Sequence, residues 1–433
     1  MRRVKSCLVI AVLFSLGPFA AAPLWGQEEP GTAAHPALEE AGQPPATLSQ
    51  EPSQPPDTSE EIGQPAAGTP EDQLVTTVTD TQPETGFDIR EDIARARAFL
   101  SDAESGYTVS IEKVVVPVRG RHGGTKLKVL ERRVIEPVFL LAVEDLNERD
   151  IKAVRFTSKG CETEGFDVVK IVNNGVASRF EVRSPGNMAV LALRTMVRGG
   201  RKGYREVIYT PYSPQIDTPE VREEGLTYLK SQIESAWGDL EKRKVALRAL
   251  QEVPDDVAPT EISLVLSIVE HIDPLRFKKR PPGGETALVH EVLTIVGANA
   301  NDAYAYSRSP AGARGLFQFI PRTYEKMLRK YRGAALERSF VAGSRDLVNA
   351  AKASLLLFDS DLGDLPSDYL LLIGNDAQTV PRYLAAAYNC GSKRVERSLK
   401  ACSDGWTCHL PEETKTYLKK FDAVWRMREW LDK

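Results

Sequence analysis

The chain has 433 residues, with 56 Lys and Arg, 60 Asp and Glu, and a net charge of −4. That length is enough for two or three domains. Residues 86–433 carry a net charge of about +5, which favours an anionic partner only mildly. No nucleic-acid-binding motif accompanies this charge, so nucleic acid is excluded as the expected partner.

Residues 1–27 have the three parts of a secretory signal peptide. Arg2, Arg3 and Lys5 form a basic start, Leu8–Leu16 is apolar, and small residues follow it. The apolar run is shorter than the about 20 residues that span a membrane. Cys7 precedes that run, where lipidation is not expected. We therefore expect export to the periplasm, either free or associated with the cell envelope.

Residues 28–85 have the composition of a disordered tether. They contain ten prolines, twelve acidic residues and no Lys or Arg. Such a segment lacks the apolar side chains needed to build a core. We expect it to have no catalytic role.

Four cysteines remain once the signal peptide is removed, and an exported protein can oxidise them. They are Cys161, Cys390, Cys402 and Cys408. Cys402 and Cys408 flank a turn-like loop, which favours a disulfide between these two. A zinc site is the alternative, but beyond His409 no fourth ligand lies at a recognisable spacing. We expect neither a metal nor an organic cofactor.

Residues 86–215 are predicted to form a β-rich domain. Phe87–Leu100 has the apolar spacing of a short amphipathic helix. Runs rich in β-branched residues then alternate with turns. The expected strands are Tyr107–Val118, Leu127–Val134, Pro137–Val143, Ala153–Thr157, Asp167–Val172, Ser178–Val182, Ala189–Leu193 and Glu206–Tyr209. This domain shows no catalytic constellation, and we expect it to position the rest of the chain or to bind a partner.

Residues 216–433 are predicted to be helical. Thr218-Pro219-Glu220 begins a helix that we expect to reach about Leu250. A second helix begins at Pro259 and ends at Glu270. Six of the eight residues in Ile262–Val269 are large and aliphatic, so this helix should be buried on nearly every side.

Glu270 is the candidate general acid. A carboxyl group beside such an apolar helix loses solvation, which raises its pKa and keeps it protonated near neutral pH. The alternative is a glutamate that emerges into water where the helix ends. Glu291 is a second candidate acid. It lies in the middle of a predicted helix, Glu285–Val296, where an ordinary solvent-facing role is expected.

Three further motifs follow Glu270 in order. The first is a Ser-x-x-Gly-Ala-x-Gly-Leu-x-Gln-x-x-Pro stretch, the second is Ala-Tyr-Asn-x-Gly, and the third contains Pro-x-Glu-Thr-x-x-Tyr. Their matching residues include Ser309, Gly312, Ala313, Gly315, Leu316, Gln318, Pro321, Tyr388, Asn389, Gly391 and Tyr417. From about residue 255 to 425 this combination resembles the SLT-type lytic transglycosylases, relatives of goose-type lysozyme.

The resemblance implies an α+β multidomain protein, in which a helical lysozyme-like catalytic domain follows the β-rich domain and the tether. It implies cleavage of peptidoglycan glycan strands between N-acetylmuramic acid and N-acetylglucosamine, with a 1,6-anhydro product. Glu270 would be the single acid and base. Ser309, Gln318, Tyr388, Asn389 and Tyr417 would bind substrate, with the Tyr388 hydroxyl available to orient Glu270. Other cell-wall proteins are candidate partners of the β-rich domain.

The chain departs from the family at two points. Glu270 and Gly312 are 42 residues apart, whereas a short spacer is usual. The interval holds a predicted basic loop, Arg276–Gly284, and the extra helix that contains Glu291. The residue after the glutamate is His271 rather than serine. These departures leave two alternatives open, a hydrolytic lysozyme and a non-catalytic peptidoglycan-binding or scaffold protein.

Overall fold

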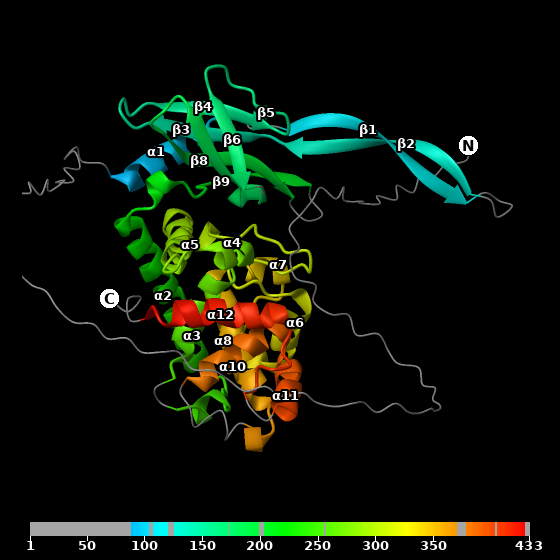
Figure 1. Ribbon diagram of the computed structural model, residues 1–433, viewed down its shortest axis with the longest axis vertical. Helices are drawn as coiled ribbons and strands as arrows, with labels where there is room; N and C mark the ends of the chain where they lie inside the picture. Colours follow the sequence, from blue (N-terminus) through cyan, green and yellow to red (C-terminus); the bar gives the residue numbers. More distant parts are fainter. Residues whose placement is uncertain are drawn as a thin grey trace, which may run out of the picture. The chain divides into compact units, whose positions relative to one another are not determined.

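The computed structural model describes residues 88–103, 107–119, 125–172, 174–198, 203–254, 257–369, 378–402 and 405–428. The predicted signal peptide and tether lie outside these ranges. The described chain contains both helices and sheets, so the predicted α+β class is confirmed (Figure 1).

The strands all lie between residues 107 and 209, where the sequence predicts them. Their bounds are β1 Tyr107–Arg119, β2 Thr125–Pro137, β3 Phe139–Asp145, β4 Ile151–Thr157, β5 Gly160–Cys161, β6 Asp167–Val172, β7 Arg179–Ser184, β8 Met188–Arg198 and β9 Tyr204–Tyr209. An antiparallel five-stranded sheet has the order β5-β4-β3-β8-β9. The first helix, α1 (Ile89–Ser101), packs on β3 and β8 of this sheet. β1 pairs with β2, and β6 with β7, as separate two-stranded ribbons.

The rest of the described chain is helical. Its α-helices are α2 Pro219–Lys242, α3 Pro259–Val269, α4 Pro274–Lys279, α5 Glu285–Asn299, α6 Pro321–Lys330, α7 Phe340–Gly343, α8 Leu347–Gly363, α10 Thr379–Cys390, α11 Ser392–Ala401 and α12 Glu412–Trp425. The prediction that the first of these continues to Leu250 is wrong. α2 ends at Lys242, and Lys244 has a positive φ of 54°, a backbone conformation that interrupts a helix.

The interval between Glu270 and Gly312 contains two helices. The predicted loop Arg276–Gly284 is in part helical, because α4 covers Pro274–Lys279. The Asp273 side chain accepts a hydrogen bond from the Arg276 backbone N–H at 2.8 Å, which caps the helix start. α5 then packs against α2. Gly225 and Gly297 allow this close packing, since a Cβ on either would lie within about 2 Å of a backbone oxygen in the other helix.

The same interval contacts the strand-rich region. Asn299, at the end of α5, accepts a hydrogen bond from the Thr210 N–H at 2.9 Å and donates one to the Thr210 carbonyl at 2.9 Å. Glu291 forms ion pairs with Arg179 of β7 and Arg276 of α4. The expectation that Glu291 faces solvent is therefore wrong, because the residue is 8% exposed and its carboxylate has two cationic partners.

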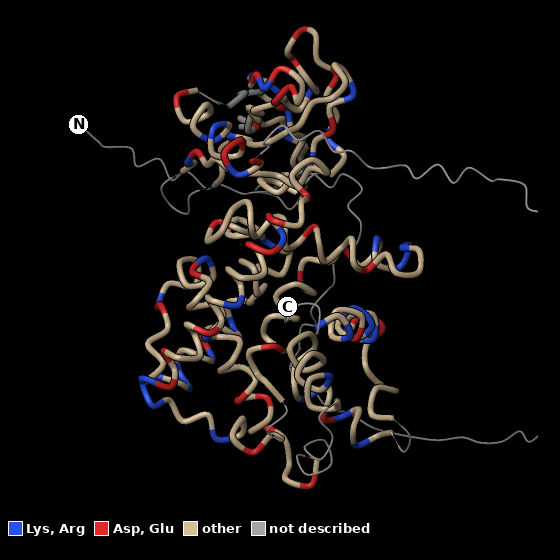
Figure 2. The backbone as a smooth tube through the Cα atoms, turned by 90° about the vertical axis from the view of Figure 1, so that its left-hand side faces the viewer, with Lys and Arg blue, Asp and Glu red and all other residues tan. Residues whose placement is uncertain are grey.

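The predicted disulfide between Cys402 and Cys408 is confirmed, with a Cα–Cα distance of 6.2 Å. Ligand atoms of these cysteines and of His409 lie close together, but the disulfide occupies both sulfurs. Acidic and basic residues are interspersed along the described chain (Figure 2). None of the described helices has the length and apolar character needed to cross a membrane.

Candidate active site

Glu270 lies directly after α3, as the sequence predicts. All residues from Ile262 to Val269 are buried, and Glu270 is the C-cap of the helix. Its N–H donates to the Leu266 carbonyl at 3.0 Å, so the backbone at Glu270 still continues the helical pattern. The side chain is partly exposed to a pocket. A rigid, buried helix therefore presents a carboxyl group at the pocket's edge.

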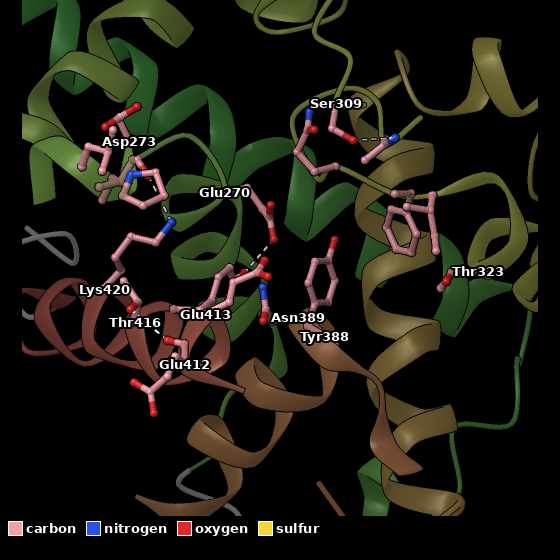
Figure 3. Close-up of a pocket in the computed structure, with 18 of the residues that line it drawn as sticks. Glu270, Asp273, Ser309, Thr323, Tyr388, Asn389, Glu412, Glu413, Thr416 and Lys420 are labelled. Carbon is pink, nitrogen blue, oxygen red and sulfur yellow. Dashed lines mark hydrogen bonds between the residues drawn. The ribbon is translucent and has the colours of Figure 1, made fainter. Parts of the chain in front are cut away.

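The pocket has a volume of about 580 Å³ and brings the motifs together. All six predicted site residues line it, namely Glu270, Ser309, Gln318, Tyr388, Asn389 and Tyr417. They come from the end of α3, from the loop before α6, and from α10 and α12. In Figure 3 the Glu270 side chain points toward the side occupied by Tyr388, Asn389 and Glu413.

The two tyrosines differ from the predicted arrangement. Tyr417 donates a hydrogen bond from its hydroxyl to Glu270 Oε1 at 2.8 Å. The Tyr388 hydroxyl instead donates to the carbonyl of Phe317. The prediction that Tyr388 orients the glutamate is therefore wrong for this structure, and Tyr417 has that contact. Spacing within a motif does not reveal which of two nearby hydroxyls reaches the carboxyl.

Burial raises the pKa of Glu270 to about 7. The ammonium of Lys420 and the Tyr417 hydrogen bond act in the opposite direction, because both favour the ionised carboxylate. The nearby Glu413 raises the pKa of Glu270 further. Near neutral pH the carboxyl can therefore be present in either protonation state, as a group that both donates and accepts a proton requires.

The loop before α6 forms another wall of the pocket. Ser309 accepts a hydrogen bond on Oγ from the Ala313 N–H at 3.0 Å, which closes a turn. Gln318 donates from Nε2 to Ser307 Oγ at 2.7 Å and to the Gly315 carbonyl at 2.6 Å. Its amide nitrogen is therefore engaged within the loop. The amide oxygen is the group that Gln318 retains for a ligand.

His271 connects this loop to the end of α3. Its Nε2 lies 2.8 Å from the Leu316 carbonyl, and its ring stacks on Tyr304 with centroids 3.6 Å apart. Burial lowers the pKa of His271 to about 3, so the ring is neutral and Nε2 donates to the carbonyl. The residue that departs from the family pattern thus holds the loop against the helix that carries Glu270.

Gly315 allows the loop to approach the segment before α8. Its φ is +73°, and an added Cβ would lie 1.9 Å from the Ser344 carbonyl oxygen. We expect Gly315→Ala to lower the free energy of unfolding by about 3 kcal/mol, since the left-handed backbone and the clash both disfavour the folded state. Gly312→Ala is the matched control, with φ +84° and its nearest atom 3.9 Å away. Urea unfolding of both variants measures the difference, and equal losses would contradict the close approach.

Three charged residues of the pocket have no place in the sequence-based prediction. Glu412 and Glu413 line it, although no second carboxylate is evident from the motifs. Lys420 lines it as well, from the third turn of α12. All three lie within or just after the Pro-x-Glu-Thr-x-x-Tyr element. Their position one helical face apart from Tyr417 is the signal that could have identified them.

A 140-residue stretch of the chain is similar to known cell-wall enzymes. It is 30% identical to the membrane-bound lytic murein transglycosylase D of Escherichia coli K12. The same identity holds for the protein of that name from E. coli O6:H1 strain CFT073. The match covers 31% of this chain and 26% of each relative, so the chain spans about a quarter of their length. No family model and no solved structure matches the chain.

Proposed function

We propose that the protein is a peptidoglycan lytic transglycosylase with a helical, lysozyme-like catalytic region. The observation that carries the proposal is the Glu270 carboxyl, held by Tyr417 in a pocket where burial raises its pKa to about 7. The likeness of one stretch of the chain to lytic murein transglycosylase D supports it. The signal-peptide pattern of residues 1–27 supports a periplasmic location.

The proposed reaction uses Glu270 twice. Its protonated carboxyl first gives its proton to the glycosidic oxygen between N-acetylmuramic acid and N-acetylglucosamine. The bond from this oxygen to C1 breaks, and the N-acetylglucosamine side leaves as an alcohol. The N-acetyl group of the muramoyl residue stabilises the cation-like centre at C1. The muramoyl 6-hydroxyl then bonds to C1 and gives its proton to the Glu270 carboxylate, which restores the acid.

The remaining predicted residues would bind the sugars. Gln318 would use its amide oxygen to accept from an N-acetyl N–H. Ser309 lies at the edge of the pocket and Asn389 at its base, where Asn389 Oδ1 accepts a hydrogen bond from Thr414 Oγ1 at 2.8 Å. The Asn389 amide nitrogen would be the group that donates to substrate. Tyr388 would contribute its ring face, because its hydroxyl is bonded to Phe317.

Hydrolysis on the same fold is the second candidate function, and Glu413 is the observation that favours it. A hydrolase needs a second carboxylate to act as nucleophile or to activate water. Glu413 lies in the same pocket, and burial raises its pKa as well. Its N–terminal neighbour Glu412 is exposed and ion-paired with Lys415.

Digestion of purified sacculi in ¹⁸O-labelled water tests the proposal. Mass spectrometry of the released muropeptides should show 1,6-anhydro ends without ¹⁸O, because no water enters the products. Reducing ends labelled with ¹⁸O would instead identify a hydrolase. Binding to sacculi without any soluble product would support the non-catalytic alternative and contradict both enzymes.

A further inference from the structure

Lys420 makes two contacts that bracket the candidate acid along the chain. Its ammonium donates to the Val269 carbonyl at 2.9 Å and to the Ile272 carbonyl at 3.1 Å. These carbonyls stand directly before Glu270 and two residues after it. Figure 3 shows the Lys420 side chain reaching from α12 toward the end of α3. Lys420 is only 5% exposed, so it is a buried cation bonded to backbone oxygens.

The end of a helix is where such a cation has its largest effect. The last carbonyls of a helix have no N–H partner within the helix and carry the negative end of its dipole. Lys420 supplies hydrogen bonds and positive charge at this end of α3. Because it holds the backbone before and after Glu270, it limits where the Glu270 side chain can point.

We propose that Lys420 is a positioning residue for Glu270, which fixes the backbone around the carboxyl and keeps a positive charge beside it. The inference rests on the proposed function, since it assigns Lys420 a part in that reaction. Lys420 exchanges no proton with substrate in this role. It acts through Glu270 alone.

The charge matters because the proposed reaction needs Glu270 in both protonation states. Burial favours the neutral carboxyl and Glu413 of α12 reinforces this, whereas Lys420 and Tyr417 favour the carboxylate. The carboxylate left after the first proton transfer therefore has a fixed cation and a hydroxyl donor near it. Without that cation, the neutral acid would be favoured and the ionised state after proton donation would be less stable.

Other groups around the pair come from the neighbouring elements. Tyr388 of α10 faces Glu270, and Asp273 at the start of α4 faces Lys420. Burial lowers the pKa of Lys420 to about 8, while Glu270, Asp273 and Glu413 oppose this change. Lys420 is therefore charged at pH 7. His271, the next residue after Glu270, is neutral because burial lowers its pKa.

A buried ammonium is a poor choice for stability alone. Removing a charge from water has a large cost that a well-packed apolar side chain avoids. α12 also has an exposed lysine next to Lys420, Lys419, which contacts neither carbonyl. The pair provides a matched comparison, because one lysine acts on the acid and the other lies in solvent.

The test uses the mature protein with Lys420→Met, Lys420→Gln and the control Lys419→Met. The release of anhydro-muropeptides from sacculi is measured against pH, with kcat and KM taken separately. We expect Lys420→Met to lower kcat on the order of 10²-fold, the usual effect of a misplaced catalytic group. The alkaline limb of its profile should move to higher pH, because loss of a cation raises the pKa of Glu270. Lys419→Met should match the wild type.

Lys420→Gln separates the two contributions, since it removes the charge but retains a donor for one carbonyl. It should show the same shift of the alkaline limb with a smaller loss of kcat. It also carries the test if Lys420→Met does not fold. A reduced kcat with the limb at its wild-type pH would overturn the inference, as would an unchanged kcat.

Infrared titration of the Glu270 carboxyl keeps this inference separate from the proposed function. The band of this carboxyl is identified by its loss in Glu270→Gln. If the wild type cleaves no glycan, the proposed function fails, and the part of the inference that concerns catalysis fails with it. The infrared midpoint then decides the charge coupling on its own. It should lie at higher pH in Lys420→Gln, and equal midpoints would overturn the coupling.

Discussion

Glu270→Gln should reduce the release of anhydro-muropeptides by about 10³-fold or more, because the variant removes both the acid and the base of the proposed reaction. The amide has nearly the shape of the carboxyl, and its oxygen can still accept the hydrogen bond from Tyr417. The fold should therefore persist. Sacculus digestion, followed by mass spectrometry, measures the rate, and thermal unfolding checks the fold.

The wild-type pH profile gives a second measurement on the same residue. The first step needs protonated Glu270, whose pKa burial raises to about 7. The rate should therefore fall as the pH rises through about 7. Glu325→Gln is the control, since Glu325 is an exposed residue of α6 far from the motifs in sequence and absent from the pocket lining. Full activity of Glu270→Gln would show that another group is the acid.

Glu291→Gln should lower the free energy of unfolding by about 3 kcal/mol, because it leaves two arginines without their shared carboxylate. The Glu291 side chain is 10% exposed, and those of Arg179 and Arg276 are 20% and 44% exposed. The partial exposure of Arg276 places the expected loss at the low end for a broken buried ion pair. Urea unfolding at pH 7 measures it.

The same Glu325→Gln variant is the control for stability. Its ion pair with Arg329 joins side chains that are 64% and 67% exposed, so the loss should stay within about 0.5 kcal/mol. Glu291→Gln should retain far more activity than Glu270→Gln at a temperature where it is folded. Its KM should rise, because Arg276 lies on α4, whose Leu275 and Lys278 line the pocket. A loss of activity equal to that of Glu270→Gln would reopen the choice between the two acids.

Local patterns in the sequence predicted most of the elements and one of the covalent links. The aliphatic run before Glu270 predicts a buried helix, because burial on all sides needs no knowledge of the partner helices. The Cys402–Cys408 disulfide closes a loop that is itself local. The convergence of the three motifs on one pocket follows from the family resemblance, which already relates those segments to each other.

Contacts between distant residues could not be predicted in this way. The partner of Glu291 on β7 is 112 residues away, and nothing near either residue indicates the other. Lys420 lies 151 residues from the Val269 carbonyl, in a helix whose neighbouring lysine is exposed. The start of α4 was missed because proline and glycine further along the interval suggested a loop. The cap by Asp273 decides the local structure there.

The two helices between Glu270 and Gly312 have a consequence for how the protein can be divided. Asn299 at the end of α5 binds both the N–H and the carbonyl of Thr210, and Tyr304 follows with an N–H 3.5 Å from the Tyr209 hydroxyl. A cut at the predicted boundary near residue 215 would strip these partners from α5. An engineered hybrid that keeps the glycan cleft but exchanges the strand-rich region would have to exchange the facing surface of α5 along with it.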